Sequence, residues 1–254
     1  MTGSATAVMM RRRIACILVG GAISIAIAGC GASIARHVDV VVIVPGAGGS
    51  LAGTEQIREG LRDAAITAPI VVFEWGAPPP LFVLNLQDRT IHDSAERRLA
   101  RQIAQWRQAN PAGHIGIIAH SAGCGVVLGA LGRLKEDAGI DSVVLLAPSV
   151  SPGYDLDAAL RQVRGRMHVF YSERDRLWLH WRTGTFGTYD NVRTPAAGNS
   201  GFVTLGQLTP ELRSRVFQHG YREQWNDLGH GGGHFGALSR AFVARVVAPA
   251  LSGD

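Results

Sequence analysis

The sequence predicts an α/β fold in which helices cover both faces of a mostly parallel sheet of about five or six strands. Short apolar runs rich in β-branched residues alternate along the chain with longer segments of helical periodicity. Runs that are apolar at nearly every position are typical of strands buried on both faces, as in a parallel sheet. The alternation indicates the same architecture, because a crossover between parallel strands usually carries a helix. Residues 38–254 fit one domain, without internal repeats or a low-complexity linker.

Five apolar segments have the length and composition of buried strands. The run from Val38 to Val44 is almost continuously β-branched, and Ile115–Ile118 and Met167–Tyr171 are short runs of the same kind. The predicted strands are 38–44, 70–75, 114–119, 142–147 and 167–171.

The segments between and after these strands have the periodicity of helices with one buried face. The predicted helices are 54–66, 93–109, 122–135, 155–164 and 235–247. The second of them carries a start signal, because Asp93 and Glu96 have the spacing of a capping box. Leu99, Ile103 and Trp106 then mark its buried face.

A serine between small residues lies at the junction of the third strand and the third helix, in Ala119-His120-Ser121-Ala122-Gly123. A sharp, strained turn at such a junction requires small neighbours and lifts the serine hydroxyl above the sheet. It also directs the backbone N–H of the next residue and the start of the helix toward any negative charge that forms there. One interpretation is therefore a reactive serine on a strained turn, and the alternative is an ordinary turn between a strand and a helix.

A glycine-rich loop, Pro45-Gly46-Ala47-Gly48-Gly49-Ser50, leaves the first strand. One interpretation is a loop that cradles phosphate groups. The loop lacks the G-x-x-x-x-G-K-[ST] pattern, and its glycines do not have the G-x-G-x-x-G spacing. A phosphate-binding loop is therefore not favoured.

These two motifs resemble those of the α/β-hydrolase family. The serine segment resembles the G-x-S-x-G nucleophile elbow, with Ala119 in place of the first glycine. The loop resembles the H-G-x-x-G oxyanion loop, with Pro45 in place of the histidine. The resemblance implies that Ser121 is the nucleophile and that the backbone N–H groups of Ala122 and Ala47 form the oxyanion hole.

The same resemblance implies a serine–acid–histidine order along the chain. Asp175 has the place of the acid, just past a late strand, with Glu173 and Asp190 as alternatives. His234 has the place of the base, directly before the last helix, with His230 as the alternative. A zinc site at the two histidines is not expected, since their glycine neighbours disfavour a helix and no Glu or Cys accompanies them. No metal or other cofactor is expected.

The resemblance further implies a minimal, three-layer form of the fold, closer to cutinase-like enzymes than to larger relatives. No predicted strand precedes the strand over 38–44, which the oxyanion loop follows. After the fourth strand, the next helix follows Pro148 within about ten residues, which leaves no room for a large cap domain. Two long loops, 76–92 and 176–210, remain. Their aromatic residues, which include Trp178, Trp181 and Phe186, either line an apolar acyl pocket or seal the edge of the sheet.

The amino terminus has the pattern of a secretory signal. Three arginines, 11–13, precede an uncharged, mostly apolar run over 14–28, which is shorter than the roughly 20 residues of a transmembrane helix. The run ends in Ile27-Ala28-Gly29-Cys30, which resembles the lipobox of bacterial lipoproteins. An ordinary signal peptide and an uncleaved anchor are the alternatives.

The lipobox resemblance implies cleavage of a signal peptide over 1–29 and lipidation of Cys30. A tether over 30–37 then attaches the catalytic domain, 38–254, to a bacterial membrane in the cell envelope. Loss of three arginines lowers the formal charge from +5 to about +2, and no basic run follows them, so nucleic acid is not expected as a partner. Cys124 is then left as a single buried thiol, and no disulfide is expected.

The sequence therefore predicts a lipid-anchored serine hydrolase of the carboxylesterase or lipase kind, which acts on a small-molecule ester or related acyl compound through an acyl-enzyme. One alternative is a non-catalytic binding or scaffold protein with the same fold. Such proteins usually lack a member of the triad, whereas Ser121, Asp175 and His234 are all present here. Another alternative is a peptidase or thioesterase with the same triad.

Overall fold

The computed structural model describes most of the chain, namely residues 38–49, 53–78, 81, 83–135, 139–175 and 187–252. The predicted signal peptide, Cys30 and the tether over 30–37 lie outside the described residues. So do the three aromatic residues of 176–186 that were predicted to line a pocket or seal the sheet edge. Among the described residues, no helix combines the length and the apolar character needed to cross a bilayer.

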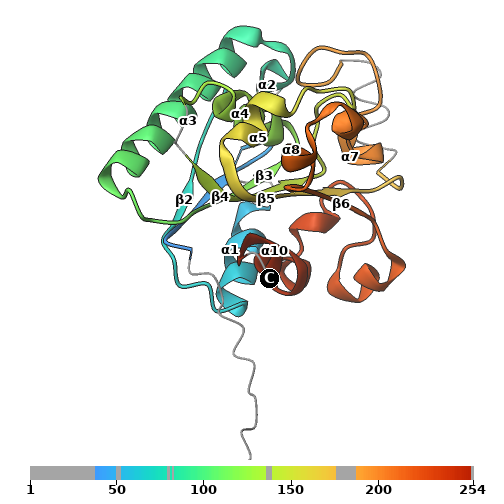
Figure 1. Ribbon diagram of the computed structural model, residues 1–254. Helices are drawn as coiled ribbons and strands as arrows, with labels where there is room; N and C mark the ends of the chain where they lie inside the picture. Colours follow the sequence, from blue (N-terminus) through green and yellow to red (C-terminus); the bar gives the residue numbers. More distant parts are fainter. Residues whose placement is uncertain are drawn as a thin grey trace, which may run out of the picture. The chain divides into compact units, whose positions relative to one another are not determined.

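One parallel sheet forms the centre of the structure (Figure 1). Its strands are β1 (Val40–Val44), β2 (Ile70–Val72), β3 (Ile115–His120), β4 (Ile140–Leu146), β5 (Val163–Tyr171) and β6 (Val216–Gly220). They lie in the order β2-β1-β3-β4-β5-β6, and every neighbouring pair is parallel. The prediction of a parallel sheet of five or six strands is confirmed, although β6 has no counterpart among the predicted strands.

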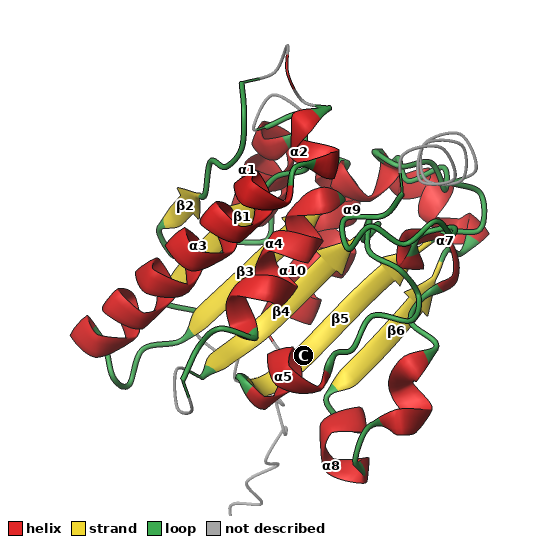
Figure 2. Cartoon of the chain, turned by 90° about the horizontal axis from the view of Figure 1, so that it is seen from above, coloured by secondary structure: helices red, strands yellow, loops and turns green. Residues whose placement is uncertain are grey.

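Helices cover both faces of the sheet, which gives three layers (Figures 1 and 2). One face carries α3 (Arg89–Ala109), α4 (Ala122–Leu131) and α5 (Asp157–Arg161). The other carries α1 (Thr54–Asp63) and the carboxy-terminal α9 (Arg240–Phe242), a π-helical turn (Val243–Val247) and α10 (Ala248–Ser252). The remaining short helices and 3-10 turns are α2 (Leu84–Gln87), α7 (Ala197–Ser200), α8 (Pro210–Arg213), Thr204–Gln207, Glu223–Leu228 and Gly236–Leu238.

The central strands are buried on both faces, as their continuous apolar runs predict. Along β3, Ile115 and Ile117 pack into the core beneath α3 and α4, whereas Ile118 points into the core on the α1 face. β4 alternates in the same way, with Leu145 in the first core and Leu146 in the second. Only residues 147–156 separate β4 from α5, so the described chain has no cap domain at that point.

The prediction that the long helix begins at Asp93 is wrong. The helix begins at Arg89, because the carboxylate of Asp88 accepts hydrogen bonds from two backbone N–H groups of the first turn. Asp93 and Glu96 therefore lie inside the helix and form no capping box. Their carboxylates instead pair with Arg133, which follows α4.

The prediction of a single helix over 235–247 is also wrong at its start. Ser239 has an extended conformation and interrupts the helix, while its hydroxyl donates a hydrogen bond to the Leu228 carbonyl (2.6 Å). The helix begins after it and continues to Ser252. The predicted helices over 54–66, 122–135 and 155–164 are present but shorter, and they end at Asp63, Leu131 and Arg161.

Candidate active site

Both sequence motifs lie at the carboxyl ends of β1 and β3, which are neighbours in the sheet. The chain passes from β1 outward to β2 and then returns to β3, so the strand order reverses between β1 and β3. The segments that leave β1 and β3 at such a point run to opposite faces of the sheet and leave a crevice between them, where ligands bind in open α/β sheets. The glycine loop follows β1 and Ser121 follows β3, so both motifs border this crevice.

The turn at Ser121 has the strained backbone that the motif predicts. Ser121 has φ of 53° and ψ of −124°, a conformation that non-glycine residues rarely adopt. Small neighbours permit the turn. A Cβ on Gly123 would lie 2.4 Å from the Pro45 carbonyl oxygen and 2.5 Å from that of Val44. Ala119 is fully buried in the core beneath α4, where its methyl group is accommodated.

Ser121, His234 and Asp175 form a continuous hydrogen-bonded chain. The Ser121 Oγ lies 3.0 Å from His234 Nε2, and His234 Nδ1 lies 2.8 Å from Asp175 Oδ2. All three side chains are at most 8% exposed, so the chain is largely shielded from water. The structure thus brings together three residues from distant parts of the sequence, each at a position that the resemblance predicts.

The partners of His234 fix the positions of its protons. A carboxylate only accepts hydrogen bonds, so Nδ1, which faces Asp175, carries the ring proton of the neutral imidazole. Nε2 then has a free lone pair that accepts the hydroxyl proton of Ser121. This is the tautomer that a general base needs.

The residues considered as alternatives to Asp175 and His234 bind other partners or are exposed. Asp190 accepts hydrogen bonds from the backbone and the hydroxyl of Ser151, at 2.8 and 2.5 Å, and Glu173 is exposed. His230 stacks on Trp225, with ring centroids 5.6 Å apart, and its Nδ1 accepts a backbone N–H of its own loop. Burial lowers the pKa of His230 to about 4 and keeps it neutral.

The glycine loop lies directly beside the serine. A Cβ on Gly46 would lie 3.1 Å from the Cβ of Ser121. The backbone N–H of Ala122 is at the first turn of α4, where amides have no partner within the helix. Neither this N–H nor that of Ala47 donates a hydrogen bond to another described residue. Both donors are therefore available to an anion at Ser121.

His120 is a residue of the site that the sequence analysis did not identify. Its Nε2 donates a hydrogen bond to the backbone carbonyl of His234 (3.1 Å), and its ring is 3% exposed. Burial, reinforced by the neighbouring His234, lowers the pKa of His120 to about 3 and keeps the ring neutral. His120 thus fastens the histidine loop to the end of β3, a role that no local sequence signal reveals.

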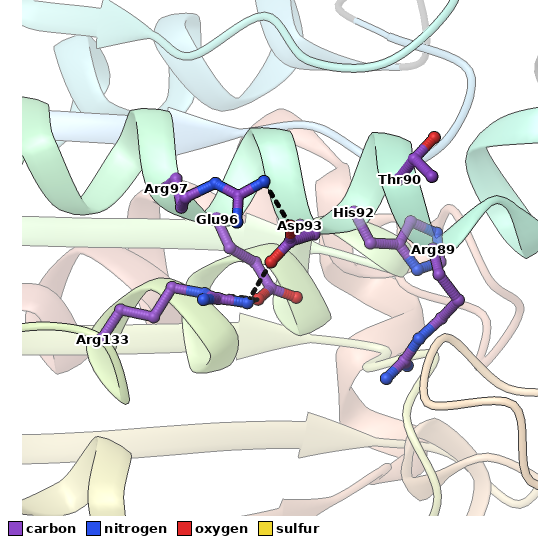
Figure 3. A pocket seen from close by; sticks show the side chains of 7 residues that line it. All are labelled: Arg89, Thr90, His92, Asp93, Glu96, Arg97 and Arg133. Atoms are coloured by element: carbon purple, nitrogen blue, oxygen red, sulfur yellow. Dashed lines mark hydrogen bonds and ion pairs between the residues drawn. The ribbon is translucent and has the colours of Figure 1, made fainter.

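A cavity of about 420 Å³ lies beside the first half of α3 (Figure 3). Its lining residues are Arg89, Thr90, His92, Asp93, Glu96, Arg97 and Arg133. Glu96 pairs with Arg133 (2.9 Å) and accepts a hydrogen bond from the Tyr189 hydroxyl (2.9 Å). These bonds join α3 to α4 and to the loop at Tyr189.

Within the described part of the chain, no cluster of three or more His, Cys, Asp or Glu side chains is placed to hold a metal ion.

The match to one protein family agrees with this architecture. Residues 38–179 match the family described as "Alpha/beta hydrolase of unknown function (DUF900)". A comparison with curated protein sequences gave no match.

Three solved structures are similar in fold. A protein assigned to the alpha/beta hydrolase superfamily from Xanthomonas campestris pv. campestris has 17% identity and a TM-score of 0.45, over 81% of this chain and 96% of that chain. A cutinase-like protein from Cryptococcus sp. has 15% identity and a TM-score of 0.45, over 87% of this chain and 98% of that chain. Aspergillus fumigatus lipase B has 18% identity and a TM-score of 0.49, over 86% of this chain and 54% of that chain.

Proposed function

This chain belongs to the α/β-hydrolase family of unknown function that its residues 38–179 match, and we propose that it is a serine hydrolase that cleaves an ester or related acyl bond. One observation carries the proposal. Ser121, His234 and Asp175 form a buried chain of hydrogen bonds of 3.0 and 2.8 Å, in the tautomer that activates a serine.

The proposed reaction begins when His234 Nε2 takes the hydroxyl proton of Ser121 as Oγ attacks the acyl carbon. The carboxylate of Asp175 stabilises the resulting imidazolium. The backbone N–H groups of Ala47 and Ala122 donate hydrogen bonds to the negatively charged oxygen of the tetrahedral intermediate, and such donors are each worth about 2.7–4 kcal/mol. His234 then gives the proton to the leaving alcohol, and water hydrolyses the acyl-enzyme by the same steps.

Exposed apolar side chains next in sequence to His234 and to Asn85 support an apolar acyl substrate. Phe235 directly follows His234 and is 43% exposed. On the side of the oxyanion loop, Leu84 is 45% exposed and is adjacent to Asn85, which binds the Ala47 carbonyl. An apolar group of the substrate would gain about 25 cal/mol for each Å² of apolar surface that it buries there.

The test is labelling of the purified protein with a fluorophosphonate probe, followed by assays with acyl esters of increasing chain length. Ser121→Ala should abolish labelling and turnover without unfolding the protein. His234→Ala should lower kcat by several orders of magnitude, because the general base is lost. Asp175→Asn should lower it by up to about 10⁴-fold, through the wrong imidazole tautomer.

Two matched variants serve as controls. His230→Ala and Asp190→Asn remove the same functional groups from residues whose hydrogen bonds go to Gly232 and to Ser151, so both variants should keep most of the activity. A Ser121→Ala variant with wild-type activity would refute the proposal. A folded wild-type protein that is neither labelled nor active would favour the binding or scaffold role.

We further propose, from the sequence alone, that the mature protein begins at a lipidated Cys30 in the cell envelope. The residues between Cys30 and Val38 span at most roughly 25 Å, at about 3.3–3.6 Å per residue. The domain would therefore lie close to the membrane surface. Labelled palmitate should appear on the wild-type protein and be absent from Cys30→Ser. Wild-type protein that is cleaved elsewhere and carries no lipid would exclude the anchor.

A further inference from the structure

Three consecutive backbone carbonyls of the oxyanion loop are each held by a hydrogen bond. The donors are side chains from outside the loop for the first and third carbonyls, and a backbone N–H within the loop for the second. The bonds are Trp75 Nε1 to Pro45 O (2.8 Å), Gly49 N to Gly46 O (3.0 Å) and Asn85 Nδ2 to Ala47 O (2.8 Å). The orientation of each peptide plane in this stretch is therefore fixed.

The fixed planes determine where the Ala47 N–H points. This N–H belongs to the same planar trans peptide as the Gly46 carbonyl, so the two groups point in opposite directions. The carbonyl is directed into the loop, toward the Gly49 N–H. The Ala47 N–H is therefore directed out of the loop, and it has no acceptor among the described residues. Rotation of this plane would break the bond between the Gly49 N–H and the Gly46 carbonyl, while the bonds to the Pro45 and Ala47 carbonyls hold the peptides on either side of it.

Asn85 is itself held in a single orientation. Its Nδ2 donates to the carbonyls of Ala47 and Ala77, at 2.8 and 2.9 Å, and its Oδ1 accepts the Ala77 N–H (2.6 Å). The side chain is 1% exposed. It packs so closely that a Cβ on Gly76 would lie 2.3 Å from Oδ1. Both amide donors have acceptors, so the side chain has no satisfactory alternative rotamer.

A second layer supports Asn85 from the side of the cavity. His92 donates from Nε2 to the Asn85 backbone carbonyl (2.9 Å) and stacks on Tyr189, with ring centroids 3.8 Å apart. The Tyr189 hydroxyl donates to Glu96, which pairs with Arg133. Figure 3 shows His92 and Glu96 projecting from the same helix, with Arg133 opposite Glu96. The oxyanion loop is thus connected to α3 and to Arg133, which follows α4, through hydrogen bonds, one ring stack and an ion pair.

We propose that Asn85 and Trp75 are positioning residues that aim the Ala47 N–H at the oxyanion, an inference that rests on the proposed function. The two side chains hold the peptides on either side of Gly46-Ala47. Without either bond the loop gains freedom to rotate its peptide planes and to turn the donor away from the substrate. Loss of an oxyanion donor costs about 10²–10³-fold in kcat, and partial misdirection should cost about 10–100-fold.

The test compares Asn85→Asp and Trp75→Phe with the wild-type protein, because both substitutions remove the donor and keep most of the side-chain volume. Asn110→Asp and Trp106→Phe are matched controls at the opposite end of the sheet, where neither side chain contacts the oxyanion loop. Each protein is assayed with an ester and with the thionoester of the same structure. Sulfur accepts hydrogen bonds weakly, so a thionoester gains little from oxyanion donors.

We expect kcat for the ester to fall about 10–100-fold in both variants, with KM changed less than about 3-fold, and the ester-to-thionoester rate ratio to fall in parallel. The controls should keep the wild-type ratio. A wild-type kcat and ratio in both variants would overturn the inference. An equal loss of ester and thionoester activity would also overturn it, since that pattern indicates general disruption. Either result, with Ser121→Ala inactive, leaves the proposed function intact, whereas an active Ser121→Ala refutes that function.

Discussion

Replacement of Gly123 by alanine should impair both folding and turnover, because the new methyl group has no space. Its Cβ would lie 2.4 Å from the Pro45 carbonyl oxygen, where contacts under 3.0 Å are essentially never seen, so the elbow and β1 must separate by at least about 0.6 Å. The Pro45 carbonyl is also held by Trp75, which limits its freedom to move away. Overpacking of this kind costs about 1–3 kcal/mol of stability.

The same displacement separates Ser121 from the oxyanion loop. A misplacement of about 1 Å at reacting groups costs up to roughly 100-fold in rate, so we expect kcat to fall about 10–100-fold in Gly123→Ala. Urea denaturation measures the stability and an ester assay measures kcat. Gly132→Ala is the matched control at the end of the same helix, since its Cβ would meet no atom closer than 3.6 Å. Wild-type stability and turnover in Gly123→Ala would refute this account of the elbow.

Two further predictions concern stability. Arg107→Met should lower the free energy of unfolding by about 3–5 kcal/mol without changing kcat, because the buried guanidinium donates to carbonyls of Gly113 and Gly139 at the end of the sheet opposite Ser121. Urea denaturation measures the free energy of unfolding and an ester assay measures kcat. A loss of kcat alongside the loss of stability would contradict the prediction. Burial lowers the pKa of His168 and His230 to about 4, below the value near 6.5 in the unfolded chain. The unfolded state therefore binds more protons below pH 6.5, and stability should fall between about pH 6.5 and 4 by up to roughly 1.4 kcal/mol per pH unit for each histidine. Constant stability between pH 7 and pH 5 would exclude this.

The turn at Ser121 and the glycine loop beside it are visible in the sequence because their backbones restrict the residues that they accept. Ser121 has a strained positive φ, and Gly123 packs against two carbonyl oxygens. Requirements of this kind are local and remain visible in the sequence as small residues at fixed spacing. The order of Ser121, Asp175 and His234 along the chain is also readable in the sequence. The hydrogen bonds among their side chains agree with the predicted triad, whose catalytic role stays a prediction.

β6 was not predicted because its sequence lacks the features of a buried strand. The segment Val216–Gly220 contains a glutamine, a histidine and a glycine, and most of its residues are half-buried. It lies at the edge of the sheet, where only one neighbour constrains it. Its contacts are largely aromatic, since His219 stacks against both Phe170 and His168. An edge strand stabilised in this way has no apolar run from which it can be recognised.

Asn85 was missed for a different reason. Its side chain binds a carbonyl 38 residues earlier in the chain, so its role depends on a contact that no local pattern encodes. The start of α3 was misplaced for a related reason: Asp93 and Glu96 have the spacing of a capping box, yet their partner, Arg133, lies after another helix. Polar residues with distant partners therefore limit what the sequence alone predicts here.

The position of His120 shows how His234 is kept in place beside Ser121. Ser121 and His234 are 113 residues apart, and the loop that carries His234 is rich in glycine, which gives it many accessible conformations. The hydrogen bond from His120 Nε2 to the His234 carbonyl ties that loop to the residue directly before Ser121. This bond therefore couples the position of the His234 loop to the end of β3, which carries Ser121. Burial, reinforced by the neighbouring His234, lowers the pKa of His120 to about 3, so its ring stays neutral and places no positive charge beside His234.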